Sequence, residues 1–354
     1  RRVNNMMKNT LFGLFVIGAV AALGKVFFWG ESVTNYGAYT PWGLWVGLYI
    51  LLVGTAAGAV WVGIYTTWAS GRINRLTSLS LAVAGLSLAF GLAFIGLDLG
   101  KPIKGITIFL NPSFSSKLAW ASWLYAGFFG CLAGYFLTKS KQIFLYLSGL
   151  FAVGFLAAEG LFFGTMVARQ LWYSWLTPLS FVTSALAAGT ALVTVIGLVV
   201  DKMLMAEEGI RLPRVLLYSL VAHMGVEAVH LAVGLNGDNG ALVRNLWTAW
   251  TFWGLFLIAG VILPSGLLLK GYNRLSLLPA ILIFLGLVAY KYSFVRYGFS
   301  AEPLAGLANA FQHSRLSLSY TPSLVEWVIA LGLLAGMFWV AGVILPKLLA
   351  RIEA

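Results

Sequence analysis

The sequence predicts an all-α, polytopic integral membrane helical bundle with about ten transmembrane helices. Hydrophobic residues make up 60% of the 354-residue chain and charged residues only 10%, and the mean hydropathy is +0.90. Apolar runs of about 20 residues recur along the chain, which is the length that an α-helix needs to cross a bilayer. The 40 glycines fit this class, because glycine lets membrane helices approach one another closely.

The apolar runs fall into about ten stretches, each long enough for one membrane-spanning helix. The connections between them are too short or too apolar for a separate soluble domain, and the first run is too long for a cleaved signal peptide. We expect an N-terminal helix with its outer loop over 1–38, a core bundle over 39–200 and a second bundle over 201–354. The predicted spans cover 10–29, 41–68, 76–98, 119–138, 142–168, 177–200, 214–235, 246–269, 275–295 and 323–349.

Lys and Arg are distributed unevenly between the two predicted sides of the membrane. The side with both termini holds the larger share of the 23 basic residues, including Lys139 and Arg274 in two of its connections. The positive-inside rule therefore predicts cytoplasmic N- and C-termini in the plasma membrane. The net charge of +12 then reflects contact with anionic lipid, and no nucleic-acid partner is expected. The longer connections, 96–120 and 296–322, fall on the outer side, where function or partner docking is usual.

The composition argues against a metal centre held by this chain. One cysteine, Cys131, cannot hold an iron–sulfur cluster, and no zinc-ligand spacing is present. Of the three histidines, His223 and His230 share one predicted helix and cannot clamp a haem iron from both sides. The sequence also lacks a phosphate-binding loop, a dinucleotide fingerprint and a hydrolytic triad. If electrons move here, the metal centres are expected on another chain.

Two carboxylates lie inside long apolar runs, where an ionisable side chain is costly and is therefore a candidate for function. Glu159 lies in FLAAEGLFFGTM, and Glu227 lies in VAHMGVEAVHLAV between two histidines. The spacing of His223, Glu227 and His230 places all three on one helix face. Histidine titrates near neutrality, so this stripe suits a proton relay. The alternatives are a buried polar cluster that holds helices together and, less favoured, a metal site.

Several motifs occur in a distinctive order along 40–172. YTPWGLWVGLYILLVGTAAGAV covers 39–60, and it is followed by GLDLGKP at 96–102, FLNPSFSSKLAWASW at 109–123 and ARQLW at 168–172. Together they resemble the membrane subunits of polysulfide reductase and its relatives, the NrfD-like family. In that family the third helix ends in an Asp-Leu-Gly-basic-Pro stretch, and a loop with Asn-Pro and serines leads into a Trp-rich fourth helix. The second half of the chain matches mainly in helix pattern.

The resemblance implies a quinone-interacting membrane subunit of a respiratory oxidoreductase complex of the polysulfide or sulfur reductase type. Such a subunit exchanges electrons between menaquinone or ubiquinone, which is an exchangeable substrate, and a four-cluster-type iron–sulfur subunit on the outer face. That partner transfers electrons to or from a molybdopterin-containing catalytic subunit, so this chain is expected to hold no haem and no iron–sulfur cluster. Proton translocation during anaerobic respiration is a further expectation.

The expected quinone site lies near the outer surface. Tyr49 is about eight residues into a helix that Thr40 could cap, and Glu159 lies near the outer end of its span, so both are ~12–13 Å deep at 1.5 Å per residue. A quinone needs hydrogen-bond donors at its carbonyls and a proton route, which Tyr49 and Glu159 offer. For Tyr49 the alternative is a satisfied core hydroxyl. Some relatives carry other residue types at both positions.

The remaining candidate site residues lie around the same outer end. Asp98 and Lys101 are expected to form a polar wall at the quinone entrance, with Trp42 and Trp123 lining it. The alternatives are a helix-end salt bridge with snorkelling lysines and an interfacial aromatic belt.

A membrane transporter or proton channel is the rival class, with Glu159 and the His223–Glu227–His230 stripe binding substrate or ions. The run AGVILP occurs at 259–264 and again at 341–346, which would be a weak remnant of duplicated helix pairs. A purely structural anchor is a third interpretation.

Overall fold

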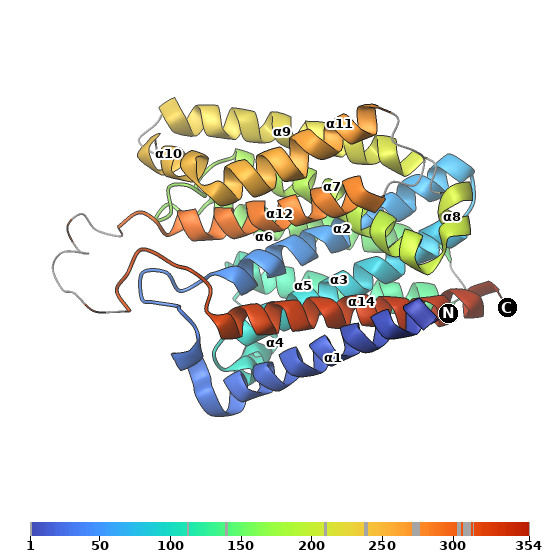
Figure 1. Ribbon diagram of the computed structural model, residues 1–354, viewed down its shortest axis with the longest axis horizontal. Coiled ribbons are helices and arrows are strands. Elements are labelled where there is room, and N and C mark those ends of the chain that lie inside the picture. The colour runs from blue at the N-terminus through green and yellow to red at the C-terminus, as the bar shows by residue number, and fades with distance from the viewer. Residues whose placement is uncertain are drawn as a thin grey trace.

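The computed structural model describes residues 2–353, except 112, 139–140, 209–210, 237–239, 271–276, 303–305, 307–312 and 314. In this part of the chain all regular structure is helical, as the sequence predicts, and the long helices lie side by side (Figure 1). The long elements are α1 (Arg2–Gly24), α2 (Leu44–Ser70), α3 (Arg75–Asp98), α5 (Lys117–Leu137), α6 (Gln142–Gly164), α7 (Leu176–Val200), α9 (Leu212–Asn236), α12 (Leu277–Gly298), α14 (Leu324–Glu353) and the π-helix η5 (Thr251–Ile262), which continues as α11 (Leu263–Leu269). Short helices are η1 (Lys25–Trp29), η2 (Gly30–Val33), η3 (Pro102–Ile106), α4 (Thr107–Leu110), α8 (Lys202–Glu207) and α10 (Gly240–Thr248).

Each predicted span corresponds to a long helix. Within the described residues, nine helices are long and apolar enough to cross a membrane. The remaining predicted span is α5, whose Trp, Tyr and Gly residues lower its hydropathy, although it has 21 residues and packs along α6. The predicted span 246–269 is wrong at its start, because residue 246 belongs to the separate helix α10. The predicted span 142–168 is too long, because the chain turns after Gly164.

The helix α2 begins later than its sequence predicts. It starts at Leu44, so its N-cap residue is Gly43 and not Thr40. No side chain caps the helix from this position. Instead, the Leu44 N–H donates to the hydroxyl of Tyr320 over 3.1 Å, and that hydroxyl donates to the Glu326 carboxylate. Burial, and next the charge of Glu326, raise the pKa of Tyr320 far above its ordinary value, so it stays protonated. A segment distant in sequence thus fixes the start of α2.

The centre of the bundle is α2, which packs against α3, α6, α7 and α12. Its contact with α7 depends on two glycines. A Cβ at Gly58 would lie 1.9 Å from the Ala185 carbonyl oxygen, and one at Gly189 would lie 2.3 Å from the Ala59 nitrogen. Two backbones meet directly there, as is usual where small residues mediate membrane helix packing.

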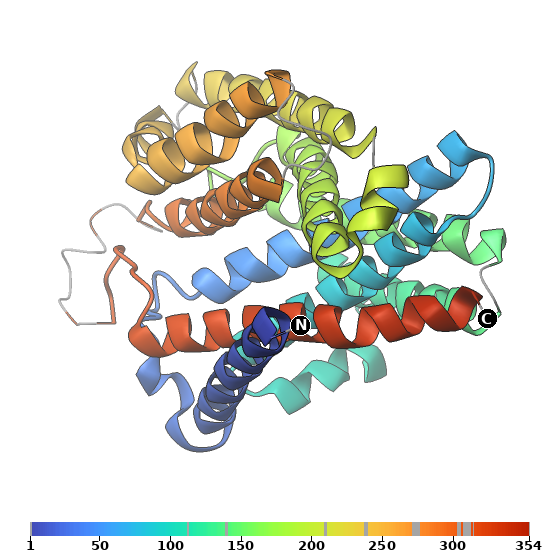
Figure 2. The same cartoon turned by 45° about the vertical axis from the view of Figure 1, so that its right-hand side comes forward.

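A pair of helices from the two ends of the chain lies at one edge of the bundle. In Figures 1 and 2, α1 and α14 lie on the opposite side from α9 and α11. They pack together where a Cβ at Gly18 would meet the Gly332 Cα at 2.6 Å. The helix α14 also packs against α3, so the pair is attached to the central helices.

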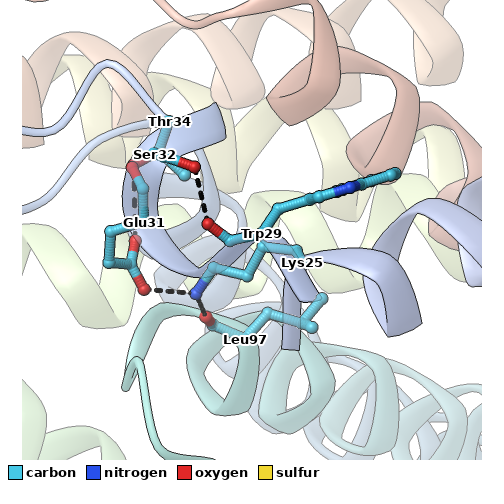
Figure 3. A network of polar contacts seen from close by, with 6 residues as sticks. All are labelled: Lys25, Trp29, Glu31, Ser32, Thr34 and Leu97. Carbon is cyan, nitrogen blue, oxygen red and sulfur yellow. Dashed lines mark hydrogen bonds and ion pairs between the residues drawn. The ribbon is translucent and has the colours of Figure 1, made fainter. Parts of the chain in front are cut away.

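A buried lysine fastens the far end of α1 to α3 (Figure 3). The Lys25 ammonium donates to the Glu31 carboxylate and to the Leu97 carbonyl, each over 2.5 Å. Lys25 is 1% exposed and its bond to the Leu97 carbonyl is buried, whereas the Glu31 side chain reaches the surface. Because an unpaired buried ammonium is costly, these two bonds satisfy it and hold the turn after α1 against the end of α3.

Both termini lie at the same end of the bundle, as predicted (Figure 1). Lys139 and Arg274, which count toward the predicted inner side, lie outside the described residues, as does Pro112 of the third motif. The two AGVILP copies differ in structure. The first spans η5 and the start of α11, whereas the second continues through α14 with Pro346 inside the helix.

Candidate functional site

Glu159 on α6 is the centre of a buried cluster of three side chains from three helices. It is 3% exposed, and its Oε1 atom accepts a hydrogen bond from the Tyr49 hydroxyl over 2.5 Å. The Tyr125 hydroxyl of α5 donates to the same oxygen and lies 2.9 Å from the Tyr49 hydroxyl. Tyr49, Tyr125 and Glu159 are here called the Glu159 cluster. Each of the three side chains lies within hydrogen-bond distance of the other two.

Tyr125 is a functional candidate that the sequence reasoning missed. It looks like one more aromatic residue of a Trp-rich helix, and only packing between α2, α5 and α6 brings it to Glu159. One signal was available in the sequence. Tyr125 lies eight residues after Lys117, where α5 begins, which places it ~12 Å along the helix, a depth similar to that expected of Tyr49.

The second oxygen of Glu159, Oε2, makes no hydrogen bond. Glu159 lines a cavity of about 170 Å³, here called the chamber. Tyr49, Asp98 and Lys117 also line it, and its walls are mainly apolar. The apolar lining comes from Trp42, Val46, Ile95, Leu99, Leu118, Ala121, Ala158, Phe162 and Phe163. The chamber is thus a small cavity with mainly apolar walls, and two residues of the Glu159 cluster, Glu159 and Tyr49, are among its lining residues.

A larger, more open cavity of about 700 Å³ adjoins the chamber and is here called the groove. The two cavities share Tyr49, Ile95, Leu99 and Leu118 as lining residues, so they meet at Tyr49. The groove runs between the end of α3, the η3–α4 segment and α5, and its lining includes Lys101, Lys104, Asn111, Ser122 and Tyr125. Its volume falls within the range of ligand pockets, about 300–1,000 Å³.

The structure brings most of the predicted quinone-site residues together. Trp42 and Asp98 line the chamber with Tyr49 and Glu159, and Lys101 lines the groove. Trp42 also stacks on Trp172, with ring centroids 5.9 Å apart and an interplanar angle of 18°.

Trp123 is the predicted site residue that lines neither cavity. It is 48% exposed and contacts the ring of Phe109 edge to face at 5.5 Å. Since Phe109 lines the groove, Trp123 supports the groove wall from its outer side.

Asp98 faces a tyrosine from the loop before α2. Its Oδ1 atom and the Tyr36 hydroxyl are both buried, and neither meets the geometry of a hydrogen bond. Burial raises the pKa of Tyr36 well above its ordinary value, and the next largest cause is the charge of Asp98. Tyr36 therefore stays protonated near neutral pH and is available as a donor to Asp98 at the rim of the chamber.

The predicted His223–Glu227–His230 stripe lies in a second polar cluster. The Ser180 hydroxyl of α7 donates to Glu227 and lies 2.9 Å from the hydroxyl of Tyr290 on α12. Ser180, Glu227 and Tyr290 are here called the Glu227 cluster. Glu227, His230 and Tyr290 line a third cavity, of about 160 Å³.

His223 lies outside the third cavity. It is fully buried, with its Nδ1 atom 3.2 Å from the Thr183 hydroxyl and its ring against Tyr290. The Nε2 atom makes no hydrogen bond. In the described part of the chain no group of three or more His, Cys, Asp or Glu side chains could hold a metal ion.

Comparisons with known proteins find matches that cover most of the chain. The family model described as "Polysulphide reductase, NrfD" matches residues 32–299. The chain is similar to a subunit of the selenate reductase of Mesobacillus selenatarsenatis, at 24% identity over 93% of this chain and 91% of the relative. It is also similar to the Hdr-like menaquinol oxidoreductase integral membrane subunit of Archaeoglobus fulgidus, at 25% identity over 96% of this chain and 93% of the relative.

Proposed function

Since the chain belongs to the NrfD family of membrane subunits of reductase complexes, we propose that it is the quinone-reactive subunit of such a complex. In this role it exchanges electrons between the quinone pool and an iron–sulfur partner. The observation that carries the proposal is the chamber, which is lined by Glu159, a carboxylate with one oxygen that makes no hydrogen bond and another that accepts from two tyrosines. The name of the Archaeoglobus fulgidus relative, a menaquinol oxidoreductase subunit, supports menaquinone or ubiquinone as the substrate.

The chamber and the groove fit the two parts of a quinone. The ring of a quinone is flat and apolar with carbonyl oxygens, and the walls formed by Trp42, Phe162 and Phe163 suit such a ring. A protonated Glu159 or the Tyr49 hydroxyl can donate to a carbonyl oxygen, and an ionised Glu159 can accept the proton of a quinol. The isoprenoid tail then lies in the groove, whose walls include Leu92, Ile108 and Phe129.

Partner docking is proposed at the same end of the bundle. Lys101 and Lys104 are exposed beside the groove opening, and Lys117 is half-buried where α5 begins. This basic rim suits an acidic face on an iron–sulfur subunit with four clusters, next to the site where electrons are exchanged. A molybdopterin catalytic subunit would follow that partner, and the terminal substrate, polysulfide or another acceptor, would be chosen there. This end is then the outer face, and the termini lie in the cytoplasm, as positive charge predicts.

The partnership is tested by purification. Solubilised from its native membrane in mild detergent, the chain is expected to co-purify with an iron–sulfur subunit. After that subunit is removed with high salt, the remaining chain should show no visible absorption from a redox group. A haem or cluster that stays with the isolated polypeptide would contradict this part of the proposal.

Tyrosine substitutions test the site. In Tyr125→Phe and in Tyr49→Phe, one of the two donors to Glu159 Oε1 is lost while the ring remains, so quinone-linked turnover is expected to fall about 3–10-fold, as for the loss of one ordinary hydrogen bond. Steady-state quinol oxidation by the purified complex measures it. Tyr135→Phe is the matched control, because its hydroxyl is also buried but bonds Ser78 at 2.9 Å, outside the chamber lining. Equal turnover in all three variants would remove both tyrosines from the site.

A further inference from the structure

Lys291 on α12 is a buried lysine that the quinone chemistry does not use. It is 2% exposed, and its ammonium makes no hydrogen bond. The ammonium lies 3.9 Å from the centre of the Phe181 ring and also faces the rings of Tyr290 and Phe294. An aromatic cage stabilises a cation by only about 2 kcal/mol even when desolvated. That is less than burying an ammonium costs, so Lys291 keeps its charge only if negative charge lies nearby.

The compensating charges come from both polar clusters. Tyr290, beside the Lys291 ammonium, belongs to the Glu227 cluster, whereas Phe181 and Phe294, also beside it, pack against Phe163 of the chamber wall. From this position between the two clusters Lys291 interacts electrostatically with Glu227 on α9 and with Glu159 on α6. The other titratable groups around it are His223 on α9 and Tyr290 on its own helix. Of the other helices packed against α12, α7, η5 and α11 contain no ionisable side chain, α2 carries Tyr49 of the Glu159 cluster and Tyr65, and α10 carries Arg244. Lys291 is thus a basic group that Glu159 and Glu227 share, and Glu227 also faces His223 and His230 on its own helix.

Lys25 shows what a purely structural buried lysine looks like in the same protein. Its ammonium has a carboxylate and a carbonyl as direct partners, and it fastens two segments together. Lys291 fastens nothing by hydrogen bonds, and an apolar side chain of similar length would fill its place among aromatic rings at lower cost. A structural role therefore does not account for a lysine at this position.

We propose that Lys291 is a positioning residue that joins the quinone chamber and the third cavity into one electrostatic unit. When Glu159 takes up a proton, the ammonium is left to Glu227 and stabilises its ionised form; when Glu227 takes up a proton, the ammonium is left to Glu159. Proton uptake at one carboxylate thus favours release at the other. The role in turnover rests on the proposed quinone function, whereas the electrostatic link is a property of the chain itself.

Infrared titration of the full-length chain in nanodiscs tests the link without quinone. The C=O stretching bands of the protonated carboxyls are assigned with Glu159→Gln and Glu227→Gln. In Lys291→Met both bands are expected to persist to a pH higher by about one unit or more, because each carboxylate loses a nearby cation. Lys291→Arg, which keeps the charge, is expected to stay close to the wild type. Lys25→Met is the matched control: it removes an equally buried ammonium that lies outside both clusters, and neither band should move.

A second variant leaves Lys291 in place. In Glu227→Gln the ammonium is free to serve Glu159 alone, so the Glu159 band should disappear at a lower pH than in the wild type. If Lys291→Met moves neither band, or moves only one, Lys291 does not link the clusters and the inference is wrong. If Lys291→Met does not fold, Glu227→Gln alone still tests the link. A Glu159 band that disappears at the same pH in Glu227→Gln as in the wild type would then contradict the inference.

Turnover separates this inference from the proposed function. In the assembled complex, Lys291→Met is expected to shift the pH profile of quinol oxidation in the same direction as the bands. A wild-type complex without quinone-linked turnover would overturn the proposed function and leave the infrared result standing. Normal turnover with unmoved bands would overturn only the link.

Discussion

Glu159→Gln is expected to lower quinone-linked turnover about 100-fold or more, the lower end of what a positioned proton-transfer group contributes. The amide keeps the volume of the side chain, and its oxygen still accepts from Tyr49 and Tyr125. It cannot gain or lose a proton at neutral pH, so only the proton route fails. Quinol oxidation by the purified complex in nanodiscs measures this loss. Activity with an artificial electron donor to the partner subunits should persist, which shows that the complex is assembled.

Glu326→Gln is the matched control for this variant. Glu326 is also a fully buried carboxylate, but it accepts from Asn35 N–H, Ser323 N–H and Tyr320 at the start of α14 and does not line the chamber. We expect a lower thermal stability and normal quinone kinetics. If Glu159→Gln also has normal kinetics, Glu159 is not part of the quinone site.

Glu227→Gln is expected to slow proton uptake or translocation about 10-fold and to change quinone affinity little, because Glu227 lies in a different cluster from the chamber. The stripe of His223, Glu227 and His230 is proposed as a proton relay, and an amide interrupts it. Complex reconstituted in vesicles, with turnover and internal pH followed together, measures both quantities.

Ser180→Ala distinguishes the relay from a cluster that only holds helices together. It removes the hydrogen bond to Glu227 but keeps the carboxyl group, so a relay predicts a smaller effect than that of Glu227→Gln. If the cluster is only structural, the near-isosteric amide is tolerated and the serine substitution is the more harmful change. Normal turnover with unchanged proton stoichiometry in Glu227→Gln would leave the stripe a structural element.

The fold class and the family were predictable because their signals are local. Hydropathy over about 20 residues identifies each span, and the motifs between 39 and 172 keep their order without reference to any contact. Glu159 and Glu227 were recognisable for the same reason, since a carboxylate within an apolar run can be identified from the sequence alone.

The parts that the sequence did not disclose depend on contacts between distant segments. Tyr125 becomes a candidate only when α5 packs beside α6, and Lys291 becomes one only when packing places it among the rings of α7 and α12. Thr40 fits the local pattern of a cap, yet Tyr320, on a distant segment, makes that contact. Tryptophan is a common residue type in ligand pockets, which made Trp123 a candidate. Which side of α5 faces the cavities is decided by tertiary packing, and Trp123 lies on another side.

The crossing of α1 with α14 at Gly18 and Gly332 has a consequence for biosynthesis. The ribosome releases α1 long before α14, and α14 is the main long helix against which α1 packs. During this interval the α1 surface at Gly18 faces lipid. The packing of α1 against α14 therefore forms last. In a chain that stalls before residue 324, α1 is expected to lack its main packing partner, and quality-control proteases can recognise such a helix.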